Sequence, residues 1–259
     1  MSAILVTGGT GTIGSYVVES LRALGRDVRT VSRHAHVPAD GTSHVVCDLR
    51  TGDGLADAMR DVETVLHLAG GASGDGALTA TVARAARTAS VAHLVLISVI
   101  GADAMPIGYF REKKAAESVV RESRVPFSIL RAAQAHSLVL PLAQMMSKLP
   151  LVPNPTGLRF EPVDPRDIAD RLVEIAEGTP AGLVPDIAGP QVYSLRELVQ
   201  SYADAVGKRC AFVRVRIPGA IGRAYRAGEN LAARDADHGE RTWEGYIAEH
   251  GALVVSARK

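Results

Sequence analysis

Short apolar runs alternate with longer amphipathic stretches in the first half of the chain. The runs are four to six residues long, are rich in Val, Leu and Ile, and do not alternate strictly with polar residues. Such runs are typical of strands buried on both faces of a parallel sheet. They cover residues 3–7, 27–32, 44–47, 64–69, 93–98 and 127–130. The stretches long enough for crossover helices are residues 12–24, 54–60, 77–90 and 109–122. The pattern predicts an α/β fold with a doubly wound parallel sheet.

The second half of the chain has a less regular pattern. Residues 135–149 are apolar with interspersed Gln, Ser and Lys, and a proline-rich segment follows them. We expect a helix over residues 165–177 and a strand over residues 212–217. Ser194 and Glu197 have the spacing of a capping box, which predicts a helix that runs to about residue 206. Signals nearer the C-terminus are weaker.

Composition limits the classes of protein that fit. The 259 residues are 47% hydrophobic and 22% charged, which excludes a disordered chain or a coiled coil. The 29 basic and 28 acidic residues form no basic block, so we expect no nucleic-acid partner. Two cysteines, Cys47 and Cys210, are too few for a disulfide framework and fit a reducing cytoplasm. Since neither a signal peptide nor a membrane-length apolar window is evident, we expect a soluble cytoplasmic protein without a membrane partner.

A glycine-rich segment directly follows the first predicted strand. It reads Thr7-Gly8-Gly9-Thr10-Gly11-Thr12-Ile13-Gly14. Glycines at these positions permit a tight turn, a close approach of the backbone to a pyrophosphate, and close packing of the next helix on the strand. The N-terminus of that helix favours the phosphate charge. The segment therefore predicts a Rossmann-like fold that binds a dinucleotide through Gly8, Thr10, Gly11, Thr12, Ile13 and Gly14.

The end of the second predicted strand distinguishes the two nicotinamide dinucleotides. An acidic residue there would bind the ribose of NAD, but the chain has Ser32 and Arg33 instead. A hydroxyl and a guanidinium suit a 2′-phosphate, so we favour NADP(H), with NAD(H) as the alternative. Asp48 and Leu49 follow the third strand, where Asp48 can accept a hydrogen bond from the adenine amino group; an ordinary turn aspartate is the competing interpretation.

These motifs resemble the short-chain dehydrogenase/reductase superfamily. The resemblance rests on the glycine segment, on Asp48-Leu49 and on His67-Leu68-Ala69-Gly70-Gly71 after the fourth strand. Residues 96–98, 109–113, 129–134 and 161–169 look like the superfamily's atypical, NmrA-like NAD(P)H-binding branch. The resemblance implies that Ala69, Gly70 and Gly71 contact the cofactor. It also implies either a quinone or other small-molecule reductase or a non-catalytic cofactor sensor.

Tyr109 and Lys113 are the candidate catalytic pair. Residues four apart lie on one face of a helix. We expect the ammonium of Lys113 to lower the pKa of the Tyr109 phenol, which would then exchange a proton with a substrate oxygen. Lys113 is also expected to bind the nicotinamide ribose, and Ser98 to polarise the substrate carbonyl. The competing interpretation places Tyr109 in a loop, because Pro106 and Gly108 precede it.

Residues after the sixth strand are expected to shape the substrate pocket. Gln134 and His136 are candidate pocket residues, and the apolar residues between 138 and 149 form either a substrate wall or a buried or subunit-contacting helix. We assign residues 1–131 to dinucleotide binding and residues 132–259, with further core elements near 163–189, to the substrate, in one structural unit. His34 and His36 lack a third ligand with suitable spacing, so we expect no metal.

The interpretation that these residues favour is an NADPH-preferring reductase of an apolar carbonyl or quinone, acting as a monomer or homodimer. A non-catalytic NAD(P)-binding redox sensor is the first alternative, because it would use the same glycine segment. A sugar-nucleotide epimerase or dehydratase is the second. That alternative stays open through Arg214 and Arg216, which could bind a pyrophosphate.

Overall fold

The computed structural model describes residues 3–35 and 42–251. In this part of the chain a nine-stranded sheet has the order β13-β10-β6-β5-β4-β1-β2-β3, with β9 beside β6. All of its strand pairs are parallel. The strands are β1 (Ala3–Thr7), β2 (Val28–Ser32), β3 (Thr42–Val46), β4 (Val62–His67), β5 (His93–Val99), β6 (Phe127–Ala132), β9 (Gly182–Leu183), β10 (Ile187–Ala188) and β13 (Asp237–His238). The predicted doubly wound, Rossmann-like sheet is confirmed.

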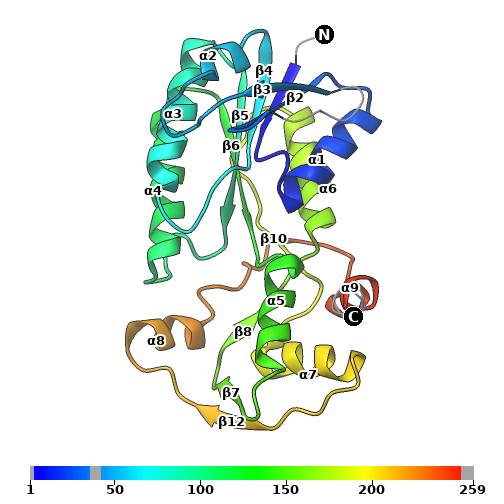
Figure 1. The fold of residues 1–259 in the computed structure, drawn as a ribbon. Helices are drawn as coiled ribbons and strands as arrows, with labels where there is room; N and C mark the ends of the chain where they lie inside the picture. Colours follow the sequence, from blue (N-terminus) through cyan, green and yellow to red (C-terminus); the bar gives the residue numbers. More distant parts are fainter. Residues whose placement is uncertain (1–2, 36–41, 252–259) are drawn as a thin grey trace.

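Helices cover both faces of the sheet (Figure 1). On one face lie α1 (Thr12–Ala23) and α6 (Pro165–Glu177), and on the other lie α2 (Leu55–Ala58), α3 (Asp75–Thr88) and α4 (Gly108–Glu122). Alternate side chains of β1 supply both layers: Ile4 and Val6 pack toward α1, whereas Ala3 and Leu5 pack toward α2 and α3. Every residue of β1 is buried. Burial on both faces explains why the strand sequences are continuously apolar.

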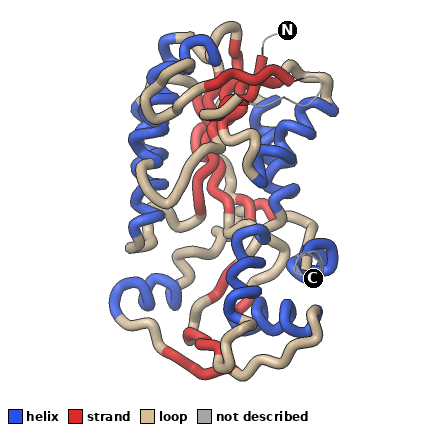
Figure 2. Tube along the Cα trace, in the orientation of Figure 1, coloured by secondary structure: helices blue, strands red, loops and turns tan. Residues whose placement is uncertain are grey.

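The remaining elements form a smaller lobe at the carboxyl edge of the sheet (Figure 2). Its helices are α5 (His136–Met146), α7 (Leu195–Ala205), α8 (Gly219–Ala227) and α9 (Trp243–His250). Its strands pair in two small sheets, β7 (Val152–Pro155) with β12 (Phe212–Val215) and β8 (Arg159–Phe160) with β11 (Tyr193–Ser194). A separate hydrophobic cluster between α5, α7 and α9 holds the lobe together. The predicted capping box of Ser194 and Glu197 is present.

The structure also corrects several expected boundaries. The third strand begins at residue 42 rather than 44, the fourth at 62 rather than 64, and the helix expected over residues 54–60 is limited to 55–58. Strands β9, β10 and β13 extend the sheet. Strands β9 and β10 lie near residues 163–189, where further core elements were expected, whereas nothing in the sequence pattern indicated β13. In the described ranges no helix combines the length and apolar character that crossing a membrane requires.

Candidate functional site

A cavity of about 560 Å³ opens at the carboxyl ends of β1, β4, β5 and β6. It is enclosed by the glycine segment after β1, the loop after β4, the start of α4 and the connection from β6 to α5. The neighbours of β1 are β2 on one side and β4 on the other, so the order of the strands reverses beside it. Ligands of open α/β sheets bind at such a reversal, outside the carboxyl ends of the strands.

The backbone of the glycine segment lies so close to neighbouring backbone that side chains at Gly8 and Gly14 would not fit. Gly8 has a φ of +72°, and a Cβ there would lie 2.8 Å from the nitrogen of Ala69. A Cβ on Gly14 would overlap the carbonyl oxygen of Gly8. Gly11 is the N-cap of α1 and provides no side-chain hydrogen bond, so N–H groups of the first turn remain for an anion. This cradle fits the pyrophosphate of a dinucleotide.

The residues predicted for the two halves of the cofactor lie in different surroundings. Thr12, Ile13, Gly70 and Gly71 line the cavity, whereas Thr10 is exposed outside its lining. None of the four residues predicted for the adenosine end lines it either. They are Ser32, Arg33, Asp48 and Leu49. Their contacts with a dinucleotide stay predictions.

Two of those four residues already make local hydrogen bonds. The Ser32 hydroxyl donates to the backbone carbonyl two residues on, at 2.7 Å. Asp48 accepts from the backbone N–H two residues on through Oδ1, at 2.8 Å, as a turn aspartate does. Arg33 is exposed at the end of β2, and Leu49 packs against the hydrophobic core. Arg33 is therefore the group of the four best placed to meet a ligand phosphate.

Buried His67 joins the glycine segment to the loop after β4. The Thr7 hydroxyl oxygen accepts from the N–H groups of Leu68 and Ala69, both at 3.2 Å, and shares a hydrogen bond with Nδ1 of His67 at 2.8 Å. Nε2 of His67 shares a second hydrogen bond with the Thr79 hydroxyl at 3.2 Å. Burial, with the nearby Lys113 charge, lowers the pKa of His67 to about 4. A neutral imidazole thus holds the two cofactor loops together.

The neutral state of His67 makes stability depend on pH. The imidazole of the unfolded chain has its ordinary pKa of 6.5 and the folded one a pKa of about 4, so between these values the unfolded state binds more protons. We expect the free energy of unfolding to fall as pH drops from 6.5 to 4, by about 3 kcal/mol in total. Urea titrations across this range measure the loss, and His67→Gln should flatten it. The control variant His34→Gln, at an exposed histidine, should keep the pH dependence of the unmodified protein. An equal decrease of the free energy of unfolding with pH in the unmodified protein and in both variants would contradict the assignment.

Tyr109 and Lys113 both face the cavity from the first turns of α4. Tyr109 is the second residue of the helix, not part of the preceding loop. The Lys113 Nζ lies 5.9 Å from the centre of the Tyr109 ring and 2.7 Å from Oδ2 of Asp75. Asp75 is the first residue of α3, and its Oδ1 accepts from the Gly71 N–H at 2.6 Å. The Asp75–Lys113 ion pair, which is almost fully buried, links α3, α4 and the loop after β4.

The expected effect of Lys113 on Tyr109 is wrong. Burial raises the pKa of the Tyr109 phenol, and the Asp75 carboxylate raises it further. Lys113 does not offset this because its charge is paired with Asp75. The phenol is thus protonated at neutral pH, the form that can donate a proton but not accept one.

Ser98 lines the cavity, but its hydroxyl already donates a hydrogen bond to a neighbouring carboxylate. It is buried in β5, and its hydroxyl donates to Oε1 of Glu117 at 2.6 Å. Glu117 is fully buried and also accepts from Arg131 at 2.8 Å and from Arg121 at 3.0 Å. These partners lower the pKa of Glu117 against the opposing effect of burial. Because the Ser98 hydroxyl donates its hydrogen bond to the Glu117 carboxylate, polarisation of a substrate carbonyl by Ser98 is not supported in this arrangement.

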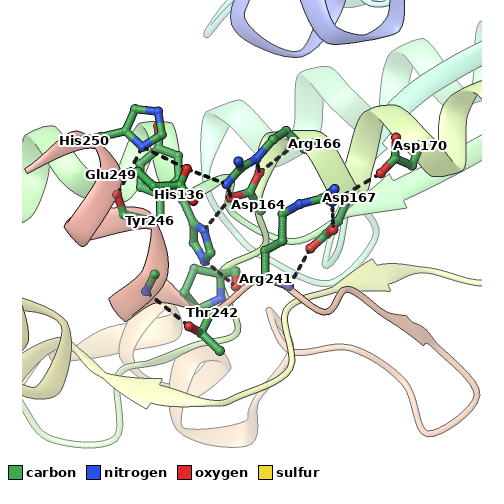
Figure 3. A network of polar contacts seen from close by, with 12 residues as sticks. His136, Asp164, Arg166, Asp167, Asp170, Arg241, Thr242, Tyr246, Glu249 and His250 are labelled. Atoms are coloured by element: carbon green, nitrogen blue, oxygen red, sulfur yellow. Dashed lines mark hydrogen bonds and ion pairs between the residues drawn. The ribbon is translucent and has the colours of Figure 1, made fainter. Parts of the chain in front are cut away.

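Gln134 and His136 have different surroundings although they are two residues apart. Gln134 lines the cavity, and its Oε1 is buried without a hydrogen-bond partner in the described chain. His136 does not line it, which corrects the expectation for this residue. It is fully buried, with its ring centre 5.6 Å from that of Trp243 and 5.1 Å from that of Tyr246. Its Nε2 donates to a backbone carbonyl at 3.1 Å, and Figure 3 shows it beside Tyr246. Its role is to attach α9 to the start of α5.

Asp75 is a site residue that the sequence patterns did not single out, and His67 was named there only as part of the motif after the fourth strand, without a role. The one available signal was an acidic residue in the first turn of a helix that follows a glycine loop. Its partner, Lys113, is on another helix, and no spacing rule connects the two. For metals, the described residues contain no cluster of three or more ligand side chains, and His36 lies outside the described residues.

The comparisons with known proteins indicate a chain that binds NAD(P)H. Residues 8–176 match the family model described as NAD(P)H-binding. An NAD(P)H azoreductase from Xenophilus azovorans is 27% identical over 221 residues, which cover 83% of this chain and 77% of the relative.

Two solved structures share the fold over nearly the whole chain. An NADPH-dependent quinone oxidoreductase from Escherichia coli, complexed with NADPH, has a TM-score of 0.80 at 19% identity. The aligned region covers 95% of this chain and 99% of the oxidoreductase chain. A nucleoside-diphosphate-sugar epimerase from Staphylococcus aureus has a TM-score of 0.75 at 18% identity, with coverages of 95% and 99%. At such identities the likeness shows the fold alone.

Proposed function

The chain belongs to the NAD(P)H-binding family, as its resemblance to the short-chain dehydrogenase/reductase superfamily indicated. We propose that it is an NAD(P)H-dependent reductase of small apolar quinones or carbonyl compounds. The observation that carries the proposal is that Tyr109 and Lys113 face the same cavity as the glycine segment. Apolar side chains such as Leu68, Ile97 and Phe110 form much of its wall. The azoreductase and the quinone oxidoreductase that it resembles support this class of reaction.

The residues present fit a nicotinamide dinucleotide. The glycine segment and the uncapped start of α1 suit the pyrophosphate, and Lys113 suits the nicotinamide ribose. Gln134 Oε1 needs a hydrogen-bond donor, which a carboxamide would provide. When bound, the reduced nicotinamide supplies a hydride to the substrate. Apart from this contact of Gln134, we assign cofactor binding to residues 1–131 and the substrate pocket to residues 132–259.

Tyr109 is assigned as the proton donor. Hydride addition to a carbonyl carbon leaves negative charge on the oxygen, and a protonated phenol within reach transfers a proton to it. The raised pKa of Tyr109 keeps this proton in place until the charge develops. Asp75 holds the Lys113 ammonium close to the tyrosine ring, which gives the pair a fixed position in the cavity wall.

Two other functions use the same fold. A cofactor sensor needs the glycine segment but has no need for a buried Asp75–Lys113 pair beside a cavity tyrosine. A sugar-nucleotide enzyme needs basic groups for the second pyrophosphate. Arg214 and Arg216 do not line the cavity, and Lys113 is its one basic lining residue within the described chain. The residues that line the cavity therefore favour the reductase over the cofactor sensor and the sugar-nucleotide enzyme.

A substrate panel tests the reductase directly. Purified protein is mixed with NADPH and with apolar quinones, azo compounds, aldehydes or ketones, and the loss of reduced-nicotinamide absorbance is followed. We expect turnover with at least one class. Tight NADPH binding without turnover on any class would favour the sensor, and turnover of a nucleoside-diphosphate sugar would favour the epimerase.

Cofactor preference gives a separate prediction. NADPH should bind more tightly than NADH, because Arg33 is exposed at the end of β2 where the 2′-phosphate is expected. Loss of one charge-assisted contact costs about 1.5–3 kcal/mol, so Arg33→Ala should weaken NADPH binding roughly 10- to 100-fold and leave NADH nearly unchanged. Titration calorimetry measures both. Arg84→Ala, also exposed but on α3, is the matched control, and equal affinities of the unmodified protein for the two cofactors would contradict the assignment.

A further inference from the structure

Two segments far apart in the sequence lack acidic residues and meet at one end of the molecule. Residues 137–160 contain two basic residues and residues 205–228 contain six, with no Asp or Glu in either segment. The whole chain is nearly balanced, with 29 basic and 28 acidic residues. The segments contribute β7 and β12, which pair with each other at the end remote from the N-terminus (Figure 1).

We call residues 147–156 and 207–216 the distal tip. The Val152 N–H donates to the Ala211 carbonyl at 2.8 Å, and the Thr156 N–H donates to the Val215 carbonyl at 3.0 Å. The loops that precede β7 and β12 therefore lie side by side. The basic residues of the distal tip, all exposed, are Lys148, Lys208, Arg209, Arg214 and Arg216.

The basic side chains of the distal tip have no carboxylate partners among the described residues. Ion pairs are frequent elsewhere: Arg26 pairs with Glu177 at 3.2 Å, and Arg166 pairs with Glu249 at 2.9 Å. No recorded ion pair involves either acid-free segment. The positive charge of the distal tip is thus uncompensated within the described chain and available to an anionic partner.

Exposed aliphatic side chains lie among these charges. Leu149, Leu151 and Val213 in the distal tip are 43%, 50% and 38% exposed, and Met145 on the adjoining helix α5 is 59% exposed. Of the ten large hydrophobic residues that are exposed in the described chain, six belong to the two acid-free segments. Exposed apolar residues that are concentrated in this way mark an interaction surface.

From this combination we propose that the distal tip docks on an anionic lipid bilayer. Lysine and arginine side chains are attracted to anionic headgroups, while leucine and valine side chains enter the boundary between headgroups and acyl chains. The protein would lie on the membrane without spanning it. The proposal departs from the sequence-based expectation of no membrane partner, and it does not depend on the proposed enzymatic function.

Two other occupants fit the surface less well. A second copy docked through the same patch would bring two uncompensated positive surfaces together, which is repulsive. A nucleic acid would be attracted by the charge, but it would use aromatic or hydrogen-bonding side chains to contact bases rather than exposed leucines. The aromatic residue of the tip, Phe212, is partly buried beneath Arg196, with the guanidinium 5.1 Å from the ring centre.

Vesicle co-sedimentation tests the docking. The full chain is mixed with vesicles of phosphatidylcholine alone or of phosphatidylcholine with phosphatidylglycerol. We expect binding to the anionic vesicles alone, weakened by salt. Each basic residue contributes roughly a fivefold affinity, so K208E/R209E should reduce binding at least about 25-fold. L149S/L151S should also reduce it, because the bilayer contact includes apolar side chains.

The chain offers matched controls for both variants. R84E/R87E reverses two exposed charges on α3, and L24S/L183S removes two exposed leucines outside the acid-free segments. Both should bind anionic vesicles like the unmodified protein. The proposal is overturned if the unmodified protein does not bind anionic vesicles, or if the control variants lose as much binding as the distal-tip variants. It is also overturned if double-stranded DNA binds as tightly as the vesicles, or if L149S/L151S turns a dimer into a monomer in analytical ultracentrifugation.

Discussion

Gly14→Ala is expected to weaken dinucleotide binding by about 100-fold or more. The added Cβ would overlap the carbonyl oxygen of Gly8 and would lie 2.8 Å from Gly8 C and Gly9 Cα, all of which are backbone atoms that cannot rotate away. The start of α1 must therefore move away from β1, and the first-turn N–H groups leave the position of the phosphates. Each charge-assisted hydrogen bond lost costs about 1.5–3 kcal/mol, so losing two gives this magnitude.

The measurement is titration calorimetry with NADPH and NADH, together with circular dichroism to show that the variant is folded. Gly178→Ala is the control, because a Cβ at the end of α6 would meet its neighbours at ordinary contact distances of 3.4 and 3.5 Å. It should bind both cofactors like the unmodified protein. If folded Gly14→Ala kept the original affinity, the cofactor could not lie on the glycine segment.

The first half of the fold is predictable because its strands are buried on both faces. A strand such as β1, with every residue buried, has to be continuously apolar, and that pattern is visible in the sequence alone. Strands β9, β10 and β13 have two residues each, too few for any periodicity to show. They join the sheet through tertiary contacts, as when Ile187 pairs with Ala132 of β6.

The candidate site is predictable where chemistry depends on local spacing. The glycine segment and the Tyr109–Lys113 spacing are local, and the structure brings both to one cavity. Burial and the carboxylate of Asp75, 34 positions away on a different helix, raise the pKa of Tyr109 instead of lowering it, and no local pattern reveals such a partner. The prediction that His136 lines the substrate pocket was wrong for a related reason. His136 is the first residue of α5 and faces α9, and the sequence does not show which helix packs there.

Tyr109→Phe is expected to lower kcat about 10²- to 10⁴-fold with a carbonyl substrate. The change keeps the ring and its packing but removes the proton that quenches charge on the substrate oxygen. Because that charge develops only in the transition state, NADPH affinity should remain nearly unchanged. Steady-state rates and titration calorimetry measure the two quantities. Tyr225→Phe is the matched control, since this partly buried tyrosine of α8 does not line the cavity, and its rate should stay the same.

The pH dependence of the rate distinguishes a proton donor from a structural tyrosine. A donor must be protonated, so kcat should fall as pH rises through the pKa of Tyr109, which burial and Asp75 place above 10. Asp75→Asn removes the negative charge that raises this pKa and frees the Lys113 ammonium, so the decline should move to lower pH. A quinone can take its proton from water, and its reduction should show neither effect. Carbonyl turnover that is unchanged in Tyr109→Phe, or a decline that Asp75→Asn does not move, would remove Tyr109 from the mechanism.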